Sequence, residues 1–250
     1  GNQYLLERLD STLESREQSS KAKMEKIEFL KKQARTEPDA HSLLNIYNKI
    51  YDEYYVFKFD SARIYVDKGL QLAYYTKDQY YINLNIILKS QLLAIGGLYS
   101  EAIANISTID IRTLDKRLLF KYYSAYSKLY FYWADYCNDN SYAPKYRTQA
   151  TEYLRKAIAN LNHNDNEYDY YMGEYYIYVE RDDRKALKHY FRTLKNLPVD
   201  SRAYAMASFA IANNYSAHHD KNRYEEYLIR ACISDVICCT KENLALQDLA

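Results

Sequence analysis

Glycine and proline are scarce in this chain of 250 residues, which contains five and three of them respectively. Tight β-turns and glycine-rich phosphate loops depend on these residues, so their shortage disfavours both and favours long helices. Long hydrophobic runs are also missing, because no stretch approaches the roughly 18 consecutive apolar residues of a membrane span. We therefore expect the sequence as given to be soluble and mainly helical.

A marked excess of charge of one sign is absent too, because 34 lysines and arginines nearly balance 33 aspartates and glutamates. Proteins that bind duplex nucleic acid normally carry a basic face or stripe. The two densest basic runs, 31–35 and 181–185, are interleaved with or flanked by acidic residues, which is typical of solvated helix faces. We expect no direct binding of nucleic acid by this region.

Catalytic and cofactor motifs are missing from the sequence. It has no Ser-His-Asp order, nucleophile elbow, phosphate loop or dinucleotide fingerprint, and its four cysteines form no CxxC pair. His218 and His219 adjoin Asp220, but neighbouring helical residues point about 100° apart and rarely share one metal ion. We expect a non-catalytic protein without cofactor or metal ion, and rank an enzyme last among the alternatives.

What the sequence does contain is a repeat at intervals of 36 to 48 residues. A small residue recurs at Ala62, Ala102, Ala150 and Ala186, and the bulkier Tyr224 completes the series. Apolar residues follow four and seven positions later in most units, so one face of each second helix is apolar. The clearest unit, 83–109, resembles a tetratricopeptide repeat, in which glycine relaxes the turn and alanine permits close helix contact.

The repeats predict an all-α fold: a tetratricopeptide-like right-handed superhelix of antiparallel helix pairs behind a long N-terminal helix. We expect the long helix over 2–36, five pairs over 40–239, and the start of a further, truncated helix over 241–250. The heptad pattern of 2–36 is interrupted at Arg16, Ser20 and Lys23, and a stable coiled coil would need an unbroken seam. We interpret this segment as two docked apolar ends with a solvated middle.

Tyrosine is abundant, with 31 residues. Tyr can bury its ring while its hydroxyl stays wet, and Tyr122, Tyr126 and Tyr130 share one helix face. We interpret most tyrosines as packing residues.

A second interpretation concerns the concave groove of tetratricopeptide proteins. Residues just after the small position of each first helix, and four to five further on, line that groove in the family. A mixture of amide and aromatic side chains there suits an extended peptide. The corresponding residues here are Asn48, Asp52, Tyr55, Gln91, Lys128, Tyr132, Tyr170, Glu174, Tyr178 and Asn213.

Three stretches carry a closer resemblance: 4–11 with 26–32, 129–146, and 233–250. Together they resemble the extracytoplasmic tetratricopeptide region of membrane-anchored Bacteroidetes proteins that are assigned as transcriptional regulators. The resemblance implies a signal peptide, a helical-repeat sensor, one membrane helix and a cytoplasmic output region. The chain lacks an initiator Met, Gly1 is typical of a residue left by protease cleavage, and 241–250 begins an amphipathic pattern without a cap. We expect both ends to be cut from a longer protein.

The leading hypothesis is thus a sensor or scaffold module at the periplasmic face of the inner membrane. We expect it to bind a peptide or protein segment in its groove and to contact the membrane only through flanking segments. The alternative is a cytoplasmic tetratricopeptide scaffold or peptide-responsive regulator. Such proteins often use a basic carboxylate clamp, and Lys128 is the single basic residue among the groove positions. The adjacent Cys238 and Cys239 fit a reducing compartment better than an oxidising one.

Overall fold

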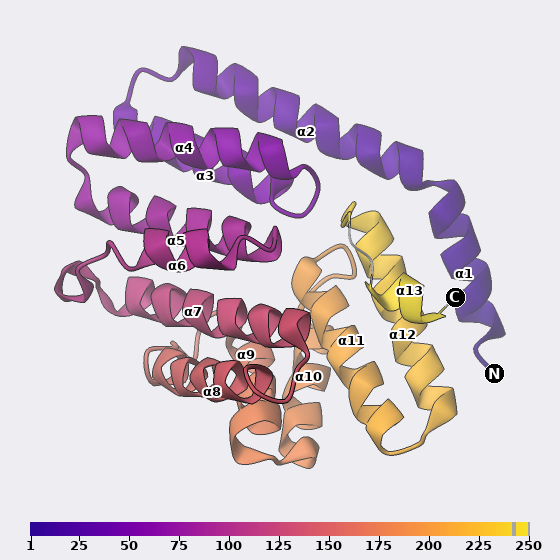
Figure 1. Ribbon diagram of the computed structural model, residues 1–250. Helices are drawn as coiled ribbons and strands as arrows, with labels where there is room; N and C mark the ends of the chain where they lie inside the picture. Colours follow the sequence, from indigo (N-terminus) through magenta and orange to yellow (C-terminus); the bar gives the residue numbers. More distant parts are fainter. Residues whose placement is uncertain (242–243, 250) are drawn as a thin grey trace. The chain divides into compact units, whose positions relative to one another are not determined.

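The computed structural model describes residues 1–241 and 244–249, and all regular structure in these residues is helical (Figure 1). The chain divides into two compact units. The central unit is Ile27–Asn162, and the end unit combines Gly1–Lys26 with His163–Ala250. No helix in the described residues is both long and apolar enough to cross a membrane.

The central unit contains three helix pairs. They are α3 (Ala40–Tyr54) with α4 (Phe59–Thr76), α5 (Gln79–Ile95) with α6 (Tyr99–Ile106), and α7 (Lys116–Cys137) with α8 (Ala143–Ala159). The partners of each pair pack on each other, and α5 packs on both α4 and α7. Aspartate caps the first helix of every pair here: Asp39, Asp78 and Asp115 each accept a hydrogen bond from the backbone N–H three residues on. Such caps satisfy amide donors that the helix itself leaves unpaired.

The small residues of the repeat lie at buried positions of the second helices. Ala62, Ala102, Ala150 and Ala186 are all completely buried, each in the second helix of its pair. Large apolar side chains pack with them: Ala102 shares a cluster with Leu93 of α5 and Leu129 of α7. A second cluster of the central unit joins Ile86 and Ile87 of α5 to residues of α6 and α7. Burying such a side chain stabilises the fold by about 1.5–3 kcal/mol. The periodic apolar faces read from the sequence therefore build the core.

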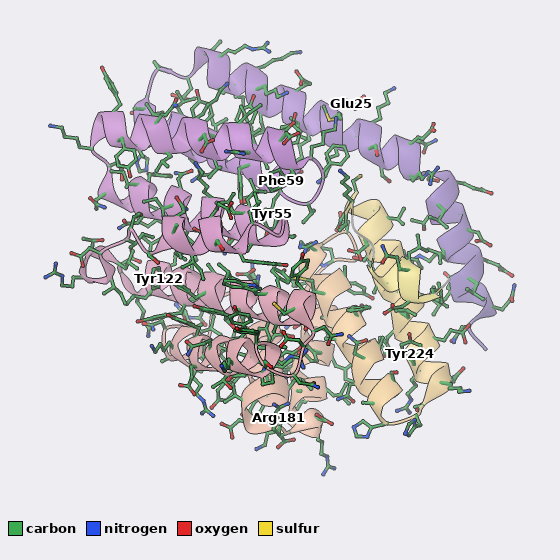
Figure 2. The ribbon with its side chains drawn as sticks, viewed as in Figure 1. Glu25, Tyr55, Phe59, Tyr122, Arg181 and Tyr224 are labelled. Atoms are coloured by element: carbon green, nitrogen blue, oxygen red, sulfur yellow. The ribbon has the colours of Figure 1, made fainter. Side chains whose placement is uncertain are left out.

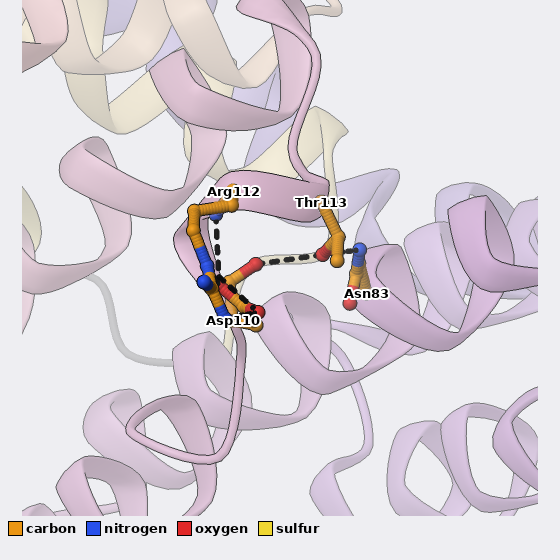
Figure 3. A network of polar contacts seen from close by, with 4 residues as sticks. All are labelled: Asn83, Asp110, Arg112 and Thr113. Carbon is orange, nitrogen blue, oxygen red and sulfur yellow. Dashed lines mark hydrogen bonds and ion pairs between the residues drawn. The ribbon is translucent and has the colours of Figure 1, made fainter.

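A short polar network holds the connection between α6 and α7, which includes the 3-10 turn η1 (Ile111–Thr113). The buried Asn83 of α5 donates from Nδ2 to Thr113 Oγ1 at 2.9 Å, and Thr113 donates to the backbone oxygen of Asp110 at 2.7 Å (Figure 3). Arg112 forms an ion pair with Asp110 at 2.7 Å, which lowers the pKa of that carboxyl to about 2. The loop is thus fixed to α5 through one amide side chain.

The end unit contains two helix pairs and both chain ends. The pairs are α9 (Tyr168–Tyr175) continued by the π-helical turn η2 (Tyr176–Glu180) with α10 (Asp183–Asn196), and α11 (Arg202–Ala217) with α12 (Lys221–Ile237). Helix α1 (Gln3–Glu14) packs on α12, as does α13 (Leu244–Leu249). Leu5 and Leu9 of α1 join Leu228, Ile229 and Cys232 of α12 in one apolar cluster.

The N-terminal segment differs from the single helix expected over 2–36. It forms α1 and α2 (Arg16–Thr36), separated at Ser15, which has φ −88° and ψ 3°. Residues 14–18 are all exposed, so no tertiary packing holds the helix together there, and Ser is a weak helix former. Leu5 and Leu9 are buried in the end unit, and Ile27 and Leu30 are buried in the central unit.

Two further segments, 241–250 and the insertion after Cys137, are compared with the boundaries predicted from the sequence. The expected helix over 241–250 includes residues 242, 243 and 250, which lie outside the described residues, while α13 spans Leu244–Leu249. The insertion after Cys137 is absorbed by a long α7 and a short loop. In that loop Asp139 Oδ1 accepts the backbone N–H groups of Ser141 and Tyr142 at 2.7 and 2.8 Å.

Several helix ends reverse direction without glycine. Non-glycine residues with φ between 40° and 60° are Lys77, Asn138, Arg181, His219 and Cys239. Three of them, Lys77, Asn138 and Arg181, are C-terminal caps of α4, α7 and η2, where the last carbonyls of a helix need partners. The other two, His219 and Cys239, lie one residue beyond the caps of α11 and α12. Because glycine is scarce, residues with a Cβ atom adopt the left-handed conformation at these turns, where it is sterically unfavourable.

Candidate functional site

The predicted groove residues of the central unit all lie on or directly after first helices. Asn48 and Asp52 belong to α3, with Tyr55 at its C-terminal cap; Gln91 belongs to α5, and Lys128 and Tyr132 to α7. Their environments differ. Asp52 is exposed, Gln91, Lys128, Tyr132 and Tyr55 are half-buried, and Asn48 is buried. The groove assignment of these residues stays a prediction.

Asn48 is the least expected member of this set. Sequence position predicts a side chain that faces a ligand, yet it is nine-tenths buried and its Oδ1 atom has no hydrogen-bond partner in the described part of the chain. One turn further on, the buried Tyr51 donates its hydroxyl to the backbone oxygen of Leu88 on α5 at 2.8 Å. Burial raises the pKa of Tyr51 well above its usual value. Its ring lies 5.6 Å from that of Tyr55, so Tyr55 is supported by a rigid neighbour. Tyr55, at the C-terminal cap of α3, is labelled in Figure 2.

An aromatic ladder joins α7 to α8. The rings of Tyr126 and Tyr153 stack at 4.5 Å, and those of Trp133 and Tyr146 also stack at 4.5 Å. Tyr130 lies between these two contacts, 5.8 Å from Tyr153 and 6.0 Å from Tyr146. Stacked rings add roughly 0.5–1.5 kcal/mol per pair beyond the area they bury. The packing interpretation of the tyrosines holds for this ladder.

One end of the ladder is exposed. Tyr136, at the end of α7, is 77% exposed, and Tyr142, before α8, is 58% exposed. The Tyr142 ring stacks on that of Tyr146 at 6.5 Å. The Tyr136 ring is tilted against that of Tyr99 at 5.8 Å, and Tyr99 stacks on Trp133. Neither residue is among the predicted groove positions, since ring exposure at a helix end depends on the neighbouring loop. This end of the ladder offers flat aromatic area to a partner.

In the end unit the predicted residues are Tyr170 and Glu174 of α9, Tyr178 of η2 and Asn213 of α11. Glu174 accepts a hydrogen bond from the hydroxyl of the buried Tyr190 at 2.6 Å. Burial, and the charge of Glu174, raise the pKa of Tyr190 well above its usual value. The carboxylate therefore has a structural partner, whatever else it binds. Tyr178 and Asn213 are exposed.

The π-helical turn changes the geometry that the sequence implies for Tyr178. The prediction placed Tyr178 one α-helical turn after Glu174, on the same face. Residues Tyr176–Glu180 instead form a π turn, which holds more residues per turn and so rotates Tyr178 relative to α-helical spacing. Such turns are frequent at functional sites. Nothing in the residue pattern of 168–180 distinguishes this turn from an ordinary helix.

Metal-ligand side chains do not gather into a binding group in the described residues. No cluster of three or more His, Cys, Asp or Glu that could hold a metal ion occurs in them. The His189 Nδ1 atom lies 2.8 Å from Asp169 Oδ1, and its ring stacks on Tyr176 at 5.5 Å, so this pair joins α10 to α9. Burial raises the pKa of Cys232 to about 12 and that of Cys238 to about 11. Both thiols are therefore weak nucleophiles.

Comparison with known proteins agrees with the repeat architecture. Residues 13–250 match the family described as the SusR N-terminal TPR domain, where TPR stands for tetratricopeptide repeat. No curated protein matches the chain significantly. TPR domains are helical-repeat modules that bind proteins or peptides, and they are generally non-catalytic. The chain belongs to the family of N-terminal TPR domains found in Bacteroidetes SusR-type regulators.

Proposed function

We propose that this region is the sensor of a membrane-anchored transcriptional regulator, located on the periplasmic face of the inner membrane, and that it binds a peptide or protein segment along its first helices. The observation that carries the proposal is the position of the polar and aromatic residues. In both units they occupy first helices, while second helices bury the small residues of the repeat.

The chemistry of these residues favours recognition of a backbone and of aromatic or apolar side chains. Gln91 and Asn213 supply amides that can pair with an extended chain, and Tyr132 and Tyr178 supply rigid contact area. Lys128 is the one cation among the ten positions. A ligand held chiefly by its C-terminal carboxylate would need a denser set of cations, so the internal part of a peptide is the better fit.

Binding would be transmitted by neighbour-to-neighbour packing. In a helical-repeat protein each repeat contacts only its neighbours, so a ligand that alters one packing contact biases the next. Helix α5 is suited to this role because it packs on α4, α6 and α7, and its Leu88 backbone oxygen holds Tyr51 of α3. A ligand on α3 or α7 would therefore act on the same central helix.

Peptide capture tests the binding surface, and each unit is tested separately. We expect Lys128→Ala with Tyr132→Ala to reduce capture of library peptides by the central unit, and Tyr178→Ala with Asn213→Ala to do so for the end unit. The matched control is Tyr74→Ala with Tyr75→Ala, because these rings are exposed on the second helix α4. If the control lost as much binding as the first-helix variants, or neither variant lost any, the surface would be misassigned.

Location and anchoring need a separate experiment. Reporter fusions placed after residue 250 of the full-length protein, and after the end of its reading frame, should show activity on opposite sides of the inner membrane. Activity of both reporters in the cytoplasm would contradict the sensor proposal and favour a cytoplasmic TPR scaffold.

A further inference from the structure

A row of cations runs along the outward side of α10. Arg184, Lys188, Arg192 and Lys195 follow one another at spacings of four, four and three residues, and all four are exposed. Because an α-helix turns by about 100° per residue, they fall within a sector of about 80° and span about 16 Å along the axis. The opposite side of the helix carries Ala186 and Tyr190, which are buried.

The acidic residues near this row are held by other partners. Asp182 caps α10 by accepting the Lys185 backbone N–H at 3.0 Å and pairs with Lys185 Nζ at 3.3 Å. Asp183 lies 3.0 Å from His218 Nε2.

Asp169 pairs with His189 at 2.8 Å and approaches Arg192 only to 3.9 Å. Arg184, Lys188 and Lys195 form no ion pair with any carboxylate in the two described ranges, 1–241 and 244–249. Asp182 and Asp183, the acidic residues of the run 181–185, therefore pair with other side chains and not with the cationic row.

An aromatic ring lies within the cationic face. Phe191 is 37% exposed, and it follows Lys188 by three residues and precedes Lys195 by four. Its ring meets that of Tyr227 on α12 edge to face at 5.7 Å. Arg230 lies over the Tyr227 ring at 5.7 Å and pairs with Glu226 at 3.0 Å. The outer side of α10 thus combines unpaired cations with a partly exposed apolar group.

We propose that this face of α10, defined by Arg184, Lys188, Phe191, Arg192 and Lys195, adsorbs to the surface of a bilayer that contains anionic phospholipid. A single convex helix provides neither a cleft nor free backbone donors for an extended peptide. A lipid surface needs neither, because it attracts a cluster of cations by charge density and accepts an aromatic ring at its headgroup boundary. This inference goes beyond the sensor function and does not depend on it. It differs from the expectation that the membrane is contacted only through flanking segments.

Vesicle co-sedimentation of the 250-residue chain tests this inference. We expect binding to vesicles of phosphatidylcholine mixed with phosphatidylglycerol, and none to phosphatidylcholine alone. The variant Arg184→Ala, Lys188→Ala, Lys195→Ala should bind the mixed vesicles roughly 100-fold more weakly, since each surface cation contributes about a factor of five. Binding of the unaltered chain should also fall as salt is raised, because exposed charges are screened.

The matched control removes three exposed cations that lie apart from one another: Lys49→Ala, Lys116→Ala, Lys221→Ala on α3, α7 and α12. Its net charge equals that of the α10 variant, and Ala preserves helix propensity in both. Equal loss in the two variants would mean that net charge alone drives adsorption, which would overturn the assignment to α10. Binding to soluble poly-glutamate but not to mixed vesicles would identify an acidic protein surface as the occupant and overturn it too.

Discussion

The hydroxyl of Tyr190 donates a hydrogen bond to Glu174 at 2.6 Å, and the same ring fills the space beside Gly173. A Cβ atom on Gly173 would lie 2.4 Å from the Tyr190 ring. One buried tyrosine of α10 thus fixes two consecutive residues of α9. It explains both why a glycine is placed in the middle of a helix and why a carboxylate of the predicted groove is held in one orientation.

Gly173→Ala should therefore destabilise the protein, although alanine is the better helix former. The helix-propensity gain is about 1 kcal/mol, while overpacking a buried ring costs about 1–3 kcal/mol, and Tyr190 is only 1% exposed. We expect a net loss of about 1 kcal/mol in chemical unfolding. In a Tyr190→Leu background the smaller side chain should remove the penalty; the same penalty in both backgrounds would contradict the contact.

Stability should fall at alkaline pH because of Tyr51 and Tyr190. Burial raises the pKa of both hydroxyls, so they stay protonated in the folded state at pH values where the unfolded chain ionises. Their contribution is complete below the unfolded pKa of about 10 and is lost as the pH rises above it, by about 1.4 kcal/mol per pH unit for each tyrosine. Unfolding measured across this range should lose part of its slope in Tyr51→Phe and in Tyr190→Phe. Unchanged slopes in both variants would refute the assignment.

Replacing Asn83 should destabilise the loop between α6 and α7 more than replacing Arg112. Asn83→Ala removes a buried donor to Thr113 and should cost about 1 kcal/mol, with faster amide hydrogen exchange over residues 107–115. Arg112→Ala removes an exposed ion pair with Asp110, and such pairs contribute little. Equal acceleration of exchange in the two variants would show that the ion pair, rather than the amide, holds the loop.

Two left-handed positions offer a stabilising change. Lys77 has φ 56° and His219 has φ 60°, a conformation that costs a non-glycine residue about 1–2 kcal/mol. We expect Lys77→Gly and His219→Gly each to stabilise the protein by roughly 0.5–1 kcal/mol, after the greater freedom of glycine in the unfolded chain is counted. The contrasting variant is Lys49→Gly, within α3, which should destabilise by about 1 kcal/mol. Thermal unfolding distinguishes the two directions.

The helix pairs were predictable because their determinants are local. Ala62, Ala102, Ala150 and Ala186 mark sites of close helix contact, and the apolar residues that follow them have helical spacing. The break between α1 and α2 at Ser15 was not predictable, since it depends on the absence of tertiary packing around residues 14–18. A sequence pattern shows which residues can pack, but not whether a partner reaches them.

The candidate surfaces were less predictable for physical reasons. The burial of Asn48 depends on neighbouring helices, and the rotation of Tyr178 depends on a π turn with no residue signature. The basic face of α10 had a signal, the four-residue spacing of Arg184, Lys188 and Arg192. Along the chain, Asp182 and Asp183 directly precede Arg184, so the run 181–185 indicates a face of mixed charge. The basic row becomes evident only when residues 184–195 are placed on a helix.

The packing of α1 on α12 has a consequence for biosynthesis. The end unit is assembled from Gly1–Lys26 and His163–Ala250, so Leu5 and Leu9 lack their partners Leu228 and Ile229 until α12 has left the ribosome. Ile27–Asn162 is continuous and has no such delay. Domains fold as units during synthesis, so the middle of this protein should fold first. Helix α1 would then pack only after Ile27–Asn162 has folded and α12 has been synthesised.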